Sequence, residues 1–329
     1  MNLKTSAATI AGALFAGAFA IPDAAAQPAS AYPIKPIRVI VHAPPGGGPD
    51  VVARIIGERL APALGQPIVV ENRPGASGTI ALAAVAKAEP DGYTLGTMSP
   101  PQVVAPSLVP QLPYDTVRDL APVRQTTRYS MILVVRAGST LRSIPELVAV
   151  AKAQPGRITY ASAGNGTPHH LAAEVFRRDA GVSIHHIPYK GAPAAAAALL
   201  GEQVDLLFTS AITVGAHIRA GRLRPLATTG PSRDGSLPDV PTLAELGFIG
   251  FDVRDWQGFV APSHTPKAII ERIATEVAKV LAQPEVVERL AGIGVEPVAD
   301  SDPALFGALI RTELERWAKV VREAGIRAD

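Results

Sequence analysis

The sequence predicts an α/β fold with two lobes, each a mostly parallel β-sheet flanked by helices. Short β-rich runs alternate with helical patterns almost throughout the chain, which is typical of parallel α/β structure. The 329 residues are enough for two domains with separate cores. Two glycine-rich turns, at residues 44–50 and 162–167, each lead from an apolar strand into a helix. Their separation by about one domain favours two lobes that contribute one turn each.

The predicted strands are short runs of β-branched and other apolar residues that end at turn-forming residues. In chain order they cover residues 37–41, 68–70, 94–97, 131–135, 158–161, 184–187, 204–208 and 225–228.

Helices are predicted between these strands from the residues at their starts. Asp50 is expected to cap the first helix, directly after the first glycine-rich turn. Ser143 and Glu146 form a capping box that opens a second helix. Pro193 stands at a first-turn position of a helix over residues 194–200.

The C-terminal part changes character. Helical patterns cover residues 266–282, 284–291 and 303–324, with one short strand expected near residues 295–298. Helices without partner strands are consistent with a segment that packs back onto an existing lobe.

Irregular stretches near residues 119–127 and 247–255 are the expected crossings between lobes. We therefore predict one lobe from residues 28–127 plus 253–329 and the other from residues 128–252.

The first 26 residues are predicted to be a secretory signal peptide. Lys4 gives a basic start, residues 10–21 are apolar, and residues 24–26 supply a small-residue cleavage site. The apolar stretch is shorter than the roughly 20 residues that span a bilayer. We expect export, cleavage between Ala26 and Gln27, and a mature protein in the periplasm; a structural first helix is the alternative.

Composition narrows the expected partners. Hydrophobic residues make up 47% and charged residues 18%, which is ordinary for a globular protein, and the net charge is +2. This balance indicates neither nucleic acid nor an anionic membrane as a partner. The chain has no cysteine, which excludes disulfides and a lipid-modified N-terminal cysteine.

The two glycine-rich turns are candidate anion-binding sites. A strand–turn–helix unit presents backbone N–H groups at the positive end of a helix dipole, and small residues let an anion approach closely. Ordinary tight loops are the alternative. The lysine of a nucleotide P-loop and the spacing of a dinucleotide fingerprint are both missing. A small acidic ligand between two lobes is therefore favoured, and no cofactor is expected.

The candidate ligand-binding residues come from both turns and from the carboxyl ends of strands, where ligands of open α/β sheets bind. For the strand-end residues, loop capping is the alternative. The candidates are Ala43, Pro45, Gly46, Gly47, Gly48, Asp50, Ser99, Gln102, Ser162, Ala163, Gly164, Asn165, Gly166, Thr167, His170, Thr209 and Ser210. Thr167 is expected to act also as a helix cap.

Two pairs of adjacent histidines, at residues 169–170 and 185–186, do not form a metal site by their spacing. Adjacent residues point about 100° apart on a helix and to opposite faces of a strand, and no third ligand follows suitably. We expect no metal, and a packing or hydrogen-bonding role for His170. Lys190 belongs either to the cleft rim or to the solvated surface, and Trp256 either to the core or to the ligand cleft.

Several motifs occur in a specific order and spacing over nearly the whole mature chain. They are Tyr32-Pro33, the Pro-Gly-Gly-Gly-x-Asp turn at 45–50, and residues 71–76, 90–95, 112–115, 162–171, 187–191, 238–242, 256–258 and 316–317. Together they resemble the extracytoplasmic solute-binding receptors of tripartite tricarboxylate transporters, often called Bug proteins.

The resemblance implies a clamshell of the periplasmic-binding-protein (Venus flytrap) type that holds one small mono- or dicarboxylic acid. It implies that both turns grip a carboxylate through backbone amides, hydroxyl side chains and ordered water. It also implies a tripartite-tricarboxylate-type membrane permease as partner; we expect a monomer. Ala43 stands where the family commonly has an aromatic residue, and Pro49 replaces a common threonine, which removes an N–H donor. These departures leave the identity of the acid open.

Two other function classes compete with a transport receptor. An exported α/β hydrolase is disfavoured because the sequence lacks a Gly-x-Ser-x-Gly elbow, a cysteine nucleophile and a His-Glu-x-x-His motif. Ser162 with His170 has no evident acid to orient the histidine, so no catalytic residue is expected. A ligand-presenting accessory of a membrane sensor would have the same fold and site, and the sequence does not separate it from a transport receptor.

Overall fold

In the computed structural model, the described residues are 32–324 and 326, and the chain from Pro33 onward forms one compact unit. The predicted signal peptide and its cleavage site between Ala26 and Gln27 lie outside the described residues.

The first sheet has six strands in the order β11-β4-β10-β3-β1-β2. Strand β1 pairs in parallel with β2 and β3, whereas β10 pairs antiparallel with β3 and β4, and β11 antiparallel with β4. The bounds are β1 Ile37–Val41, β2 Ile68–Asn72, β3 Thr94–Met98, β4 Leu120–Ser130, β10 Arg254–Pro262 and β11 Glu296–Pro297.

The second sheet has five strands in the order β7-β6-β8-β5-β9. Strand β6 pairs in parallel with β7 and β8, and β5 pairs antiparallel with β8 and β9. The bounds are β5 Ile132–Arg136, β6 Thr159–Ser162, β7 His185–Pro188, β8 Leu206–Thr209 and β9 Leu223–Thr228. Both sheets are thus mixed, whereas the sequence pattern predicts mostly parallel sheets.

The antiparallel character of the first sheet comes from β4 and β10, which the sequence pattern does not predict. Residues 119–127 and 247–255 are expected to be irregular crossings, but Leu120–Ser130 forms one continuous strand that pairs along its length with β10. Pro122 and the polar run after it disguise this strand, because many of its polar residues are buried by neighbouring elements rather than exposed to solvent.

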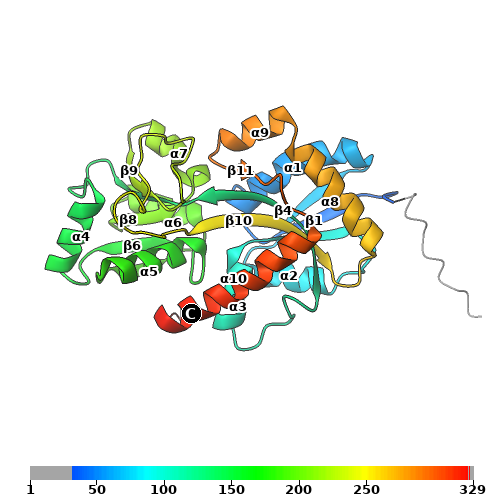
Figure 1. Cartoon of the computed structure of the whole chain (residues 1–329), viewed down its shortest axis with the longest axis horizontal. Helices are drawn as coiled ribbons and strands as arrows, with labels where there is room; N and C mark the ends of the chain where they lie inside the picture. The colour runs from blue at the N-terminus through cyan, green and yellow to red at the C-terminus, as the bar shows by residue number, and fades with distance from the viewer. Residues whose placement is uncertain (1–31, 325, 327–329) are drawn as a thin grey trace, which may run out of the picture. The chain divides into compact units, whose positions relative to one another are not determined.

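Strands β4 and β10 lie side by side and connect the two sheets (Figure 1). Strand β5 begins two residues after β4 ends. Beside it, the amide of Val253 donates to the carbonyl of Thr229 at 3.2 Å, and the Thr229 hydroxyl donates to the Val253 carbonyl at 2.6 Å. The predicted lobe boundaries fall within β4 and just before β10.

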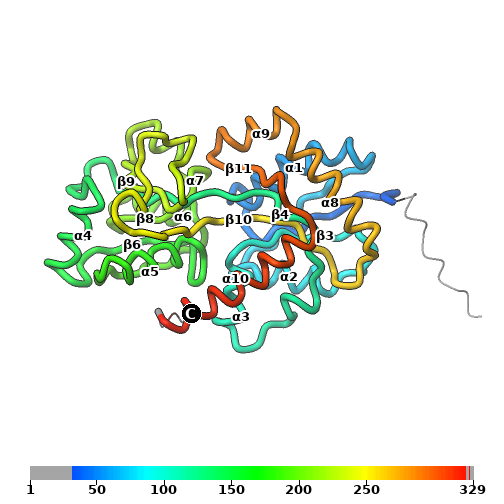
Figure 2. The backbone as a smooth tube through the Cα atoms, in the orientation of Figure 1, coloured from blue at the N-terminus to red at the C-terminus, as the bar shows by residue number. Residues whose placement is uncertain are grey.

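The helices flank both sheets, and the three predicted in the C-terminal part are confirmed. The last of them, α10, runs beside α3 (Figure 2). The bounds are α1 Gly48–Leu64, α2 Thr79–Ala86, α3 Pro100–Leu108, α4 Ile144–Ala153, α5 Pro168–Ala180, α6 Ala192–Leu200, α7 Ala211–Arg219, α8 Lys267–Leu281, α9 Pro284–Ala291 and α10 Pro303–Ala324.

The helix starts differ from the predictions in detail. Helix α1 begins at Gly48 with Gly47 as its N-cap, so Asp50 lies inside the first turn and is not the cap. Proline at the second position suits a helix start because its missing N–H would have no helical partner there. At α4, Ser143 Oγ accepts from the Glu146 amide at 3.3 Å, as predicted. In a capping box the Glu146 side chain would accept from the Ser143 amide. Here it accepts instead from the Arg142 amide, at 2.8 Å.

Trp256 lies in the core. Its ring packs edge-on against Phe306, with 5.6 Å between centroids, and its Nε1 donates to Glu313 Oε2 at 3.3 Å. Trp317 Nε1 donates to the same oxygen at 2.7 Å. The buried carboxylate of Glu313 thus accepts hydrogen bonds from both indoles, one on β10 and the other on α10.

Candidate functional site

The first glycine-rich turn satisfies much of its own backbone. The Gly46 amide donates to Asp50 Oδ2 at 2.9 Å, and the Gly47 amide donates to the Pro44 carbonyl at 3.0 Å. Asp50 is 3% exposed and also accepts from Arg54 Nε at 2.9 Å. The turn therefore already holds one carboxylate, that of Asp50, at the positive end of α1.

Gly48 is the point at which this turn meets other parts of the molecule. A Cβ atom at Gly48 would lie 3.2 Å from Tyr129 Oη, 3.3 Å from Ile212 Cδ1 and 3.7 Å from Gln257 Nε2. These neighbours come from β4 and β10 of the first sheet and from α7, the helix that follows β8 of the second sheet. Among the described residues we find no partner for the Gly48 amide, and Pro49 has no N–H to offer.

The second turn is also tied internally, but by neutral groups. The Gly164 amide donates to Ser162 Oγ at 3.1 Å, and the Gly166 amide donates to His170 Nδ1 at 3.2 Å. Thr167 occupies the N-cap position of α5, yet its hydroxyl donates to the Gly164 carbonyl at 2.6 Å, so the expected side-chain cap is not formed. No acidic side chain takes part in these bonds.

His170 packs behind the second turn. Its ring stacks on His186 with 4.0 Å between centroids, and His186 stacks in turn on Tyr160 at 4.8 Å. Burial, followed by the neighbouring His186 and Arg177, lowers the pKa of His170 to about 3. His170 is therefore a neutral imidazole at physiological pH, in the packing and hydrogen-bonding role predicted for it.

Ser162 pairs with a different histidine from the one considered in the sequence. Its Oγ lies 2.6 Å from His186 Nε2, and its side chain is fully buried. A buried hydroxyl that also binds the turn through Gly164 is a structural element of the loop. This placement gives no support to a Ser162–His170 dyad.

Each turn lies close to a segment from the other part of the molecule. Ser77 Oγ donates to the carbonyl of Asn165 at 3.2 Å, and Pro44 Cγ would lie 3.7 Å from a Cβ at Gly191. At Gly166, whose φ is +69°, a Cβ would come within 2.6 Å of Leu108 Cδ1 in α3. Ser77 and α3, which belong with the first sheet's part of the chain, thus reach the second turn, and close approach there requires glycine.

Ser99 and Gln102 form a buried capping network at the start of α3. The Ser99 amide donates to Gln102 Oε1 at 2.8 Å, and Gln102 Nε2 donates to the Ser77 carbonyl at 2.8 Å. Ser99 Oγ also lies 2.9 Å from His42 Nε2. Burial lowers the pKa of His42 to about 4, so His42 is neutral near pH 7. These bonds fit the alternative of loop capping better than direct ligand contact.

In the second sheet, Thr209 ends β8 and Ser210 is the N-cap of α7. Thr209 Oγ1 is buried and has no hydrogen-bond partner within the described part of the chain. Ser210 Oγ lies 3.5 Å from Thr213 Oγ1. The two residues join β8 to α7 and lie close in sequence to Ile212, which is near Gly48 of the first turn.

Tyr129, Asp255 and Gln257 lie on the strand pair beside Gly48; Gln257 belongs to the motif at residues 256–258, whereas the sequence does not single out Tyr129 or Asp255. Tyr129 Oη donates to Asp255 Oδ2 at 2.7 Å, and Gln257 Nε2 lies 3.5 Å from Tyr129 Oη. Burial raises the pKa of Asp255 to about 7, although Tyr129 and the Trp256 backbone act in the opposite direction. Tyr129 and Asp255 lie in or next to stretches whose composition indicates irregular crossings. The rule that ligands bind at the carboxyl ends of predicted strands therefore does not point to them.

His169, adjacent to the second turn, is another polar residue that sequence reasoning misses. It is 9% exposed, and neither ring nitrogen has a hydrogen-bond partner among residues 32–324 and 326. Burial lowers its pKa to about 4. In the sequence it stands out as half of a histidine pair and as part of the motif at residues 162–171, with no role assigned to it.

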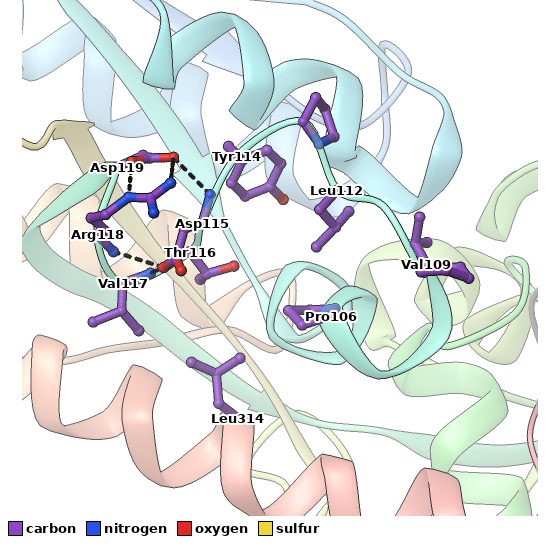
Figure 3. A pocket seen from close by; sticks show the side chains of 12 residues that line it. Pro106, Val109, Leu112, Tyr114, Asp115, Thr116, Val117, Arg118, Asp119 and Leu314 are labelled. Carbon is purple, nitrogen blue, oxygen red and sulfur yellow. Dashed lines mark hydrogen bonds and ion pairs between the residues drawn. The ribbon is translucent and has the colours of Figure 1, made fainter.

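A separate hollow of about 680 Å³ lies between the segment after α3 and α10. It is lined by residues such as Tyr114, Val117 and Leu314, with Arg118 held by Asp119 at its edge (Figure 3). None of the predicted ligand-binding residues lines it. It is therefore distinct from the candidate site.

The remaining sequence expectations concern Lys190, metal ions and membranes. Lys190 is exposed, as expected for a solvated lysine. Within the described residues, no group of three or more His, Cys, Asp or Glu side chains is arranged to hold a metal ion. None of the helices in that part of the chain combines the length and apolarity needed to cross a membrane.

Comparison with known proteins places the chain in a family. Residues 52–326 match the family described as tripartite tricarboxylate transporter family receptor. The chain is 40% identical over 315 residues to protein BugT of Bordetella pertussis, covering 94% of this chain and 96% of BugT.

Solved structures agree with the predicted fold. R. palustris Rpa4515, solved with adipate, has a TM-score of 0.85 at 33% identity, covering 91% of this chain and 100% of that one. MatC (Rpa3494) of Rhodopseudomonas palustris, with bound malate, has a TM-score of 0.82 at 31% identity, covering 88% and 100%. The predicted two-lobed α/β fold and the expectation of a solute receptor rather than an enzyme are confirmed. The chain belongs to the tripartite tricarboxylate transporter receptor family of periplasmic solute-binding proteins.

Proposed function

We propose that this protein binds one small carboxylic acid between its two glycine-rich turns and delivers it to a membrane permease of the tripartite tricarboxylate type. Family membership supports the class of function, and the similar proteins solved with adipate and malate support the class of ligand. The mature protein acts as a monomer in the periplasm after cleavage before Gln27.

The observation that carries this proposal is that each of the two helix starts lies against an element assigned to the other lobe. Gly48 at the start of α1 contacts Ile212 of α7, and Gly166 before α5 contacts Leu108 of α3. The positive end of a helix dipole favours an anion by up to about 2 kcal/mol in partly buried geometry. Hydrogen bonds to a charged group contribute about 1.5–3 kcal/mol each. A few such contacts reach the roughly 8 kcal/mol of micromolar binding after ordering costs.

The β4–β10 pair supplies the hinge in this proposal. We place one lobe at residues 28–127 plus 253–329 and the other at residues 128–252, so that the chain crosses between lobes on these two strands. The contacts at Gly48, Ser77 and Gly166 join elements of the two lobes, so a ligand that strengthens them favours the closed form.

The test is calorimetric titration with adipate, malate and succinate, and with glucose as the neutral control. We expect micromolar binding of at least one acid and none of glucose. Gly48→Ala places a methyl group 3.2 Å from Tyr129 Oη and should weaken acid binding by about tenfold or more.

Gly215→Ala is the matched control, because its Cβ meets only the end of the flexible Arg219 side chain, at 3.4 Å. It should leave affinity unchanged. Binding of glucose without any acid, or equal acid affinity in folded Gly48→Ala, would contradict the proposed site.

A further inference from the structure

Asp255 has an unusual environment for a carboxyl group. It is 7% exposed, and while Oδ2 accepts from Tyr129 Oη at 2.7 Å, Oδ1 is buried with no hydrogen-bond partner among the residues described. A buried, unsatisfied carboxylate oxygen costs folding free energy, and such groups in native proteins call for an explanation.

No basic side chain of the structure neutralises Asp255 within the described residues. The nearest arginines along its own strand and its partner strand are engaged elsewhere: Arg254 Nε binds Asp252 at 2.8 Å, and Arg128 Nε binds Glu296 at 3.2 Å. Consistent with this, burial raises the pKa of Asp255 to about 7. The charged form of this group lacks a counter-charge.

Asp255 lies beside the proposed ligand site. Its hydrogen-bond partner, Tyr129 Oη, would be 3.2 Å from a Cβ atom at Gly48. The Tyr129 hydroxyl therefore lies between the Asp255 carboxyl group and the start of α1. The carboxylate of Asp50 occupies the same turn, bound to the Gly46 amide and to Arg54. The second turn, in contrast, contains only neutral donors and acceptors in the bonds described above. On the α5 side, the buried carboxylate of Glu174 is paired with Arg177 at 2.6 Å, whereas Asp255 has no such basic partner among the described residues.

We propose that Asp255 is the determinant of ligand class in this site: the bound acid also carries a protonated amine, whose N–H groups reach Asp255 Oδ1 while its carboxylate lies at the second turn. This rests on the proposed function and deepens it. An ammonium supplies both the hydrogen bond and the positive charge that the buried carboxyl group lacks. A plain dicarboxylate would instead bring a second negative charge next to Asp255.

Two ligand pairs test this, each differing by one ammonium group: succinate with aspartate, and adipate with 2-aminoadipate. In calorimetric titrations at pH 7.5, the amino acid of at least one pair should bind about ten- to a hundredfold more tightly than its parent acid, the range expected for a charge-assisted hydrogen bond. Asp255→Asn should abolish this preference, because the amide presents an N–H donor and no charge.

Two variants separate a ligand contact from a structural role. Tyr129→Phe removes the hydroxyl that binds Asp255 but keeps the carboxylate, and it should retain the preference for the amino acid. Asp179→Asn removes an exposed carboxylate at the far end of α5 and should change nothing. Melting temperatures of all variants establish that they are folded.

The outcomes are distinguishable. Equal or tighter binding of the parent acids by the native protein, or an Asp255→Asn variant that keeps the preference, would overturn the inference while leaving carboxylate binding intact. Binding of none of the four acids would contradict the proposed function itself, and with it the inference.

Discussion

The two glycine-rich turns look alike in sequence but are closed by different chemistry. In the first, the Asp50 carboxylate accepts from the Gly46 amide and is itself held by Arg54. In the second, Ser162 and His170 accept from the amides of Gly164 and Gly166. A helix start that already holds an internal anion has less positive potential left for a ligand. We therefore expect the second turn to carry most of the affinity for a ligand carboxylate.

The substitution Gly166→Ala is the most direct test of whether the second turn carries most of the affinity. In Gly166→Ala the new methyl group would lie 2.6 Å from Leu108 Cδ1, at a φ of +69°. We expect acid binding to fall by more than about a hundredfold, since the turn must shift by more than a hydrogen bond tolerates. Isothermal titration with the tightest acid measures this.

Gly181→Ala is the control for backbone strain alone. Gly181 has a φ of +60°, but a Cβ there meets nothing within 4 Å. It should cost about 1–2 kcal/mol of stability and leave affinity unchanged. If Gly166→Ala bound acids as well as Gly181→Ala does, the second turn would not be the dominant anchor.

Acid should destabilise the protein through its buried imidazoles. The pKa values of His42 and His169 are lowered to about 4, and that of His170 to about 3, mainly by burial. Between pH 6.5 and about pH 4 the unfolded chain binds protons that the folded chain does not, so the free energy of unfolding falls as the pH falls. Asp255, with its pKa raised to about 7, makes the folded chain more stable as the pH falls. Its contribution is outweighed by those of the three histidines.

We expect a net loss of several kcal/mol across this pH window, because a tenfold change in a protonation equilibrium corresponds to about 1.4 kcal/mol. Urea unfolding at pH 7.5, 5.5 and 4.5 measures it. His169→Gln, which loses no hydrogen bond of the described structure, should make the dependence on pH shallower, whereas His264→Gln, at an exposed position, should not. Stability that rises steadily toward pH 4.5 would show that these histidines do not control it.

Asp50, in the first turn, gives the smallest expected effect on binding and a moderate one on stability. Asp50→Asn weakens the bonds to Gly46 and Arg54, each of which gains from the charge, and should cost about 1–3 kcal/mol of unfolding free energy. Affinity for acids should stay equal or rise, because an internal anion is lost. Asp91→Asn, which weakens an exposed pair with Lys35, is the control and should cost less than about 1 kcal/mol. A large loss of acid affinity in Asp50→Asn would reverse the ranking of the two turns.

The sequence predicts those features that depend on local pattern. Eight strands, the three C-terminal helices and the position of both turns follow from apolar runs, caps and glycines, and the structure has them within a few residues. The β4–β10 pair escapes prediction because Pro122 and a polar run imitate a loop, and burial of those side chains depends on distant elements.

The candidate site is predictable only in outline. Motif order identifies the turns, but it cannot show that Asp50 folds back onto Gly46, or that Ser99 and Gln102 serve a capping network. Tyr129 and Asp255 lie 126 positions apart and meet only through the pairing of β4 with β10. Such contacts are set by topology and leave no trace in local spacing.

The two buried indoles have a practical consequence. Trp256 and Trp317 are the chain's only tryptophans, and both donate to one carboxylate oxygen of Glu313. Trp256 directly follows Asp255 on a strand that links the two sheets, so a rearrangement of that strand alters the polarity and quenching around one of the two fluorophores. Intrinsic emission, compared between the native protein and Trp317→Phe, therefore offers a label-free optical record of domain motion in solution.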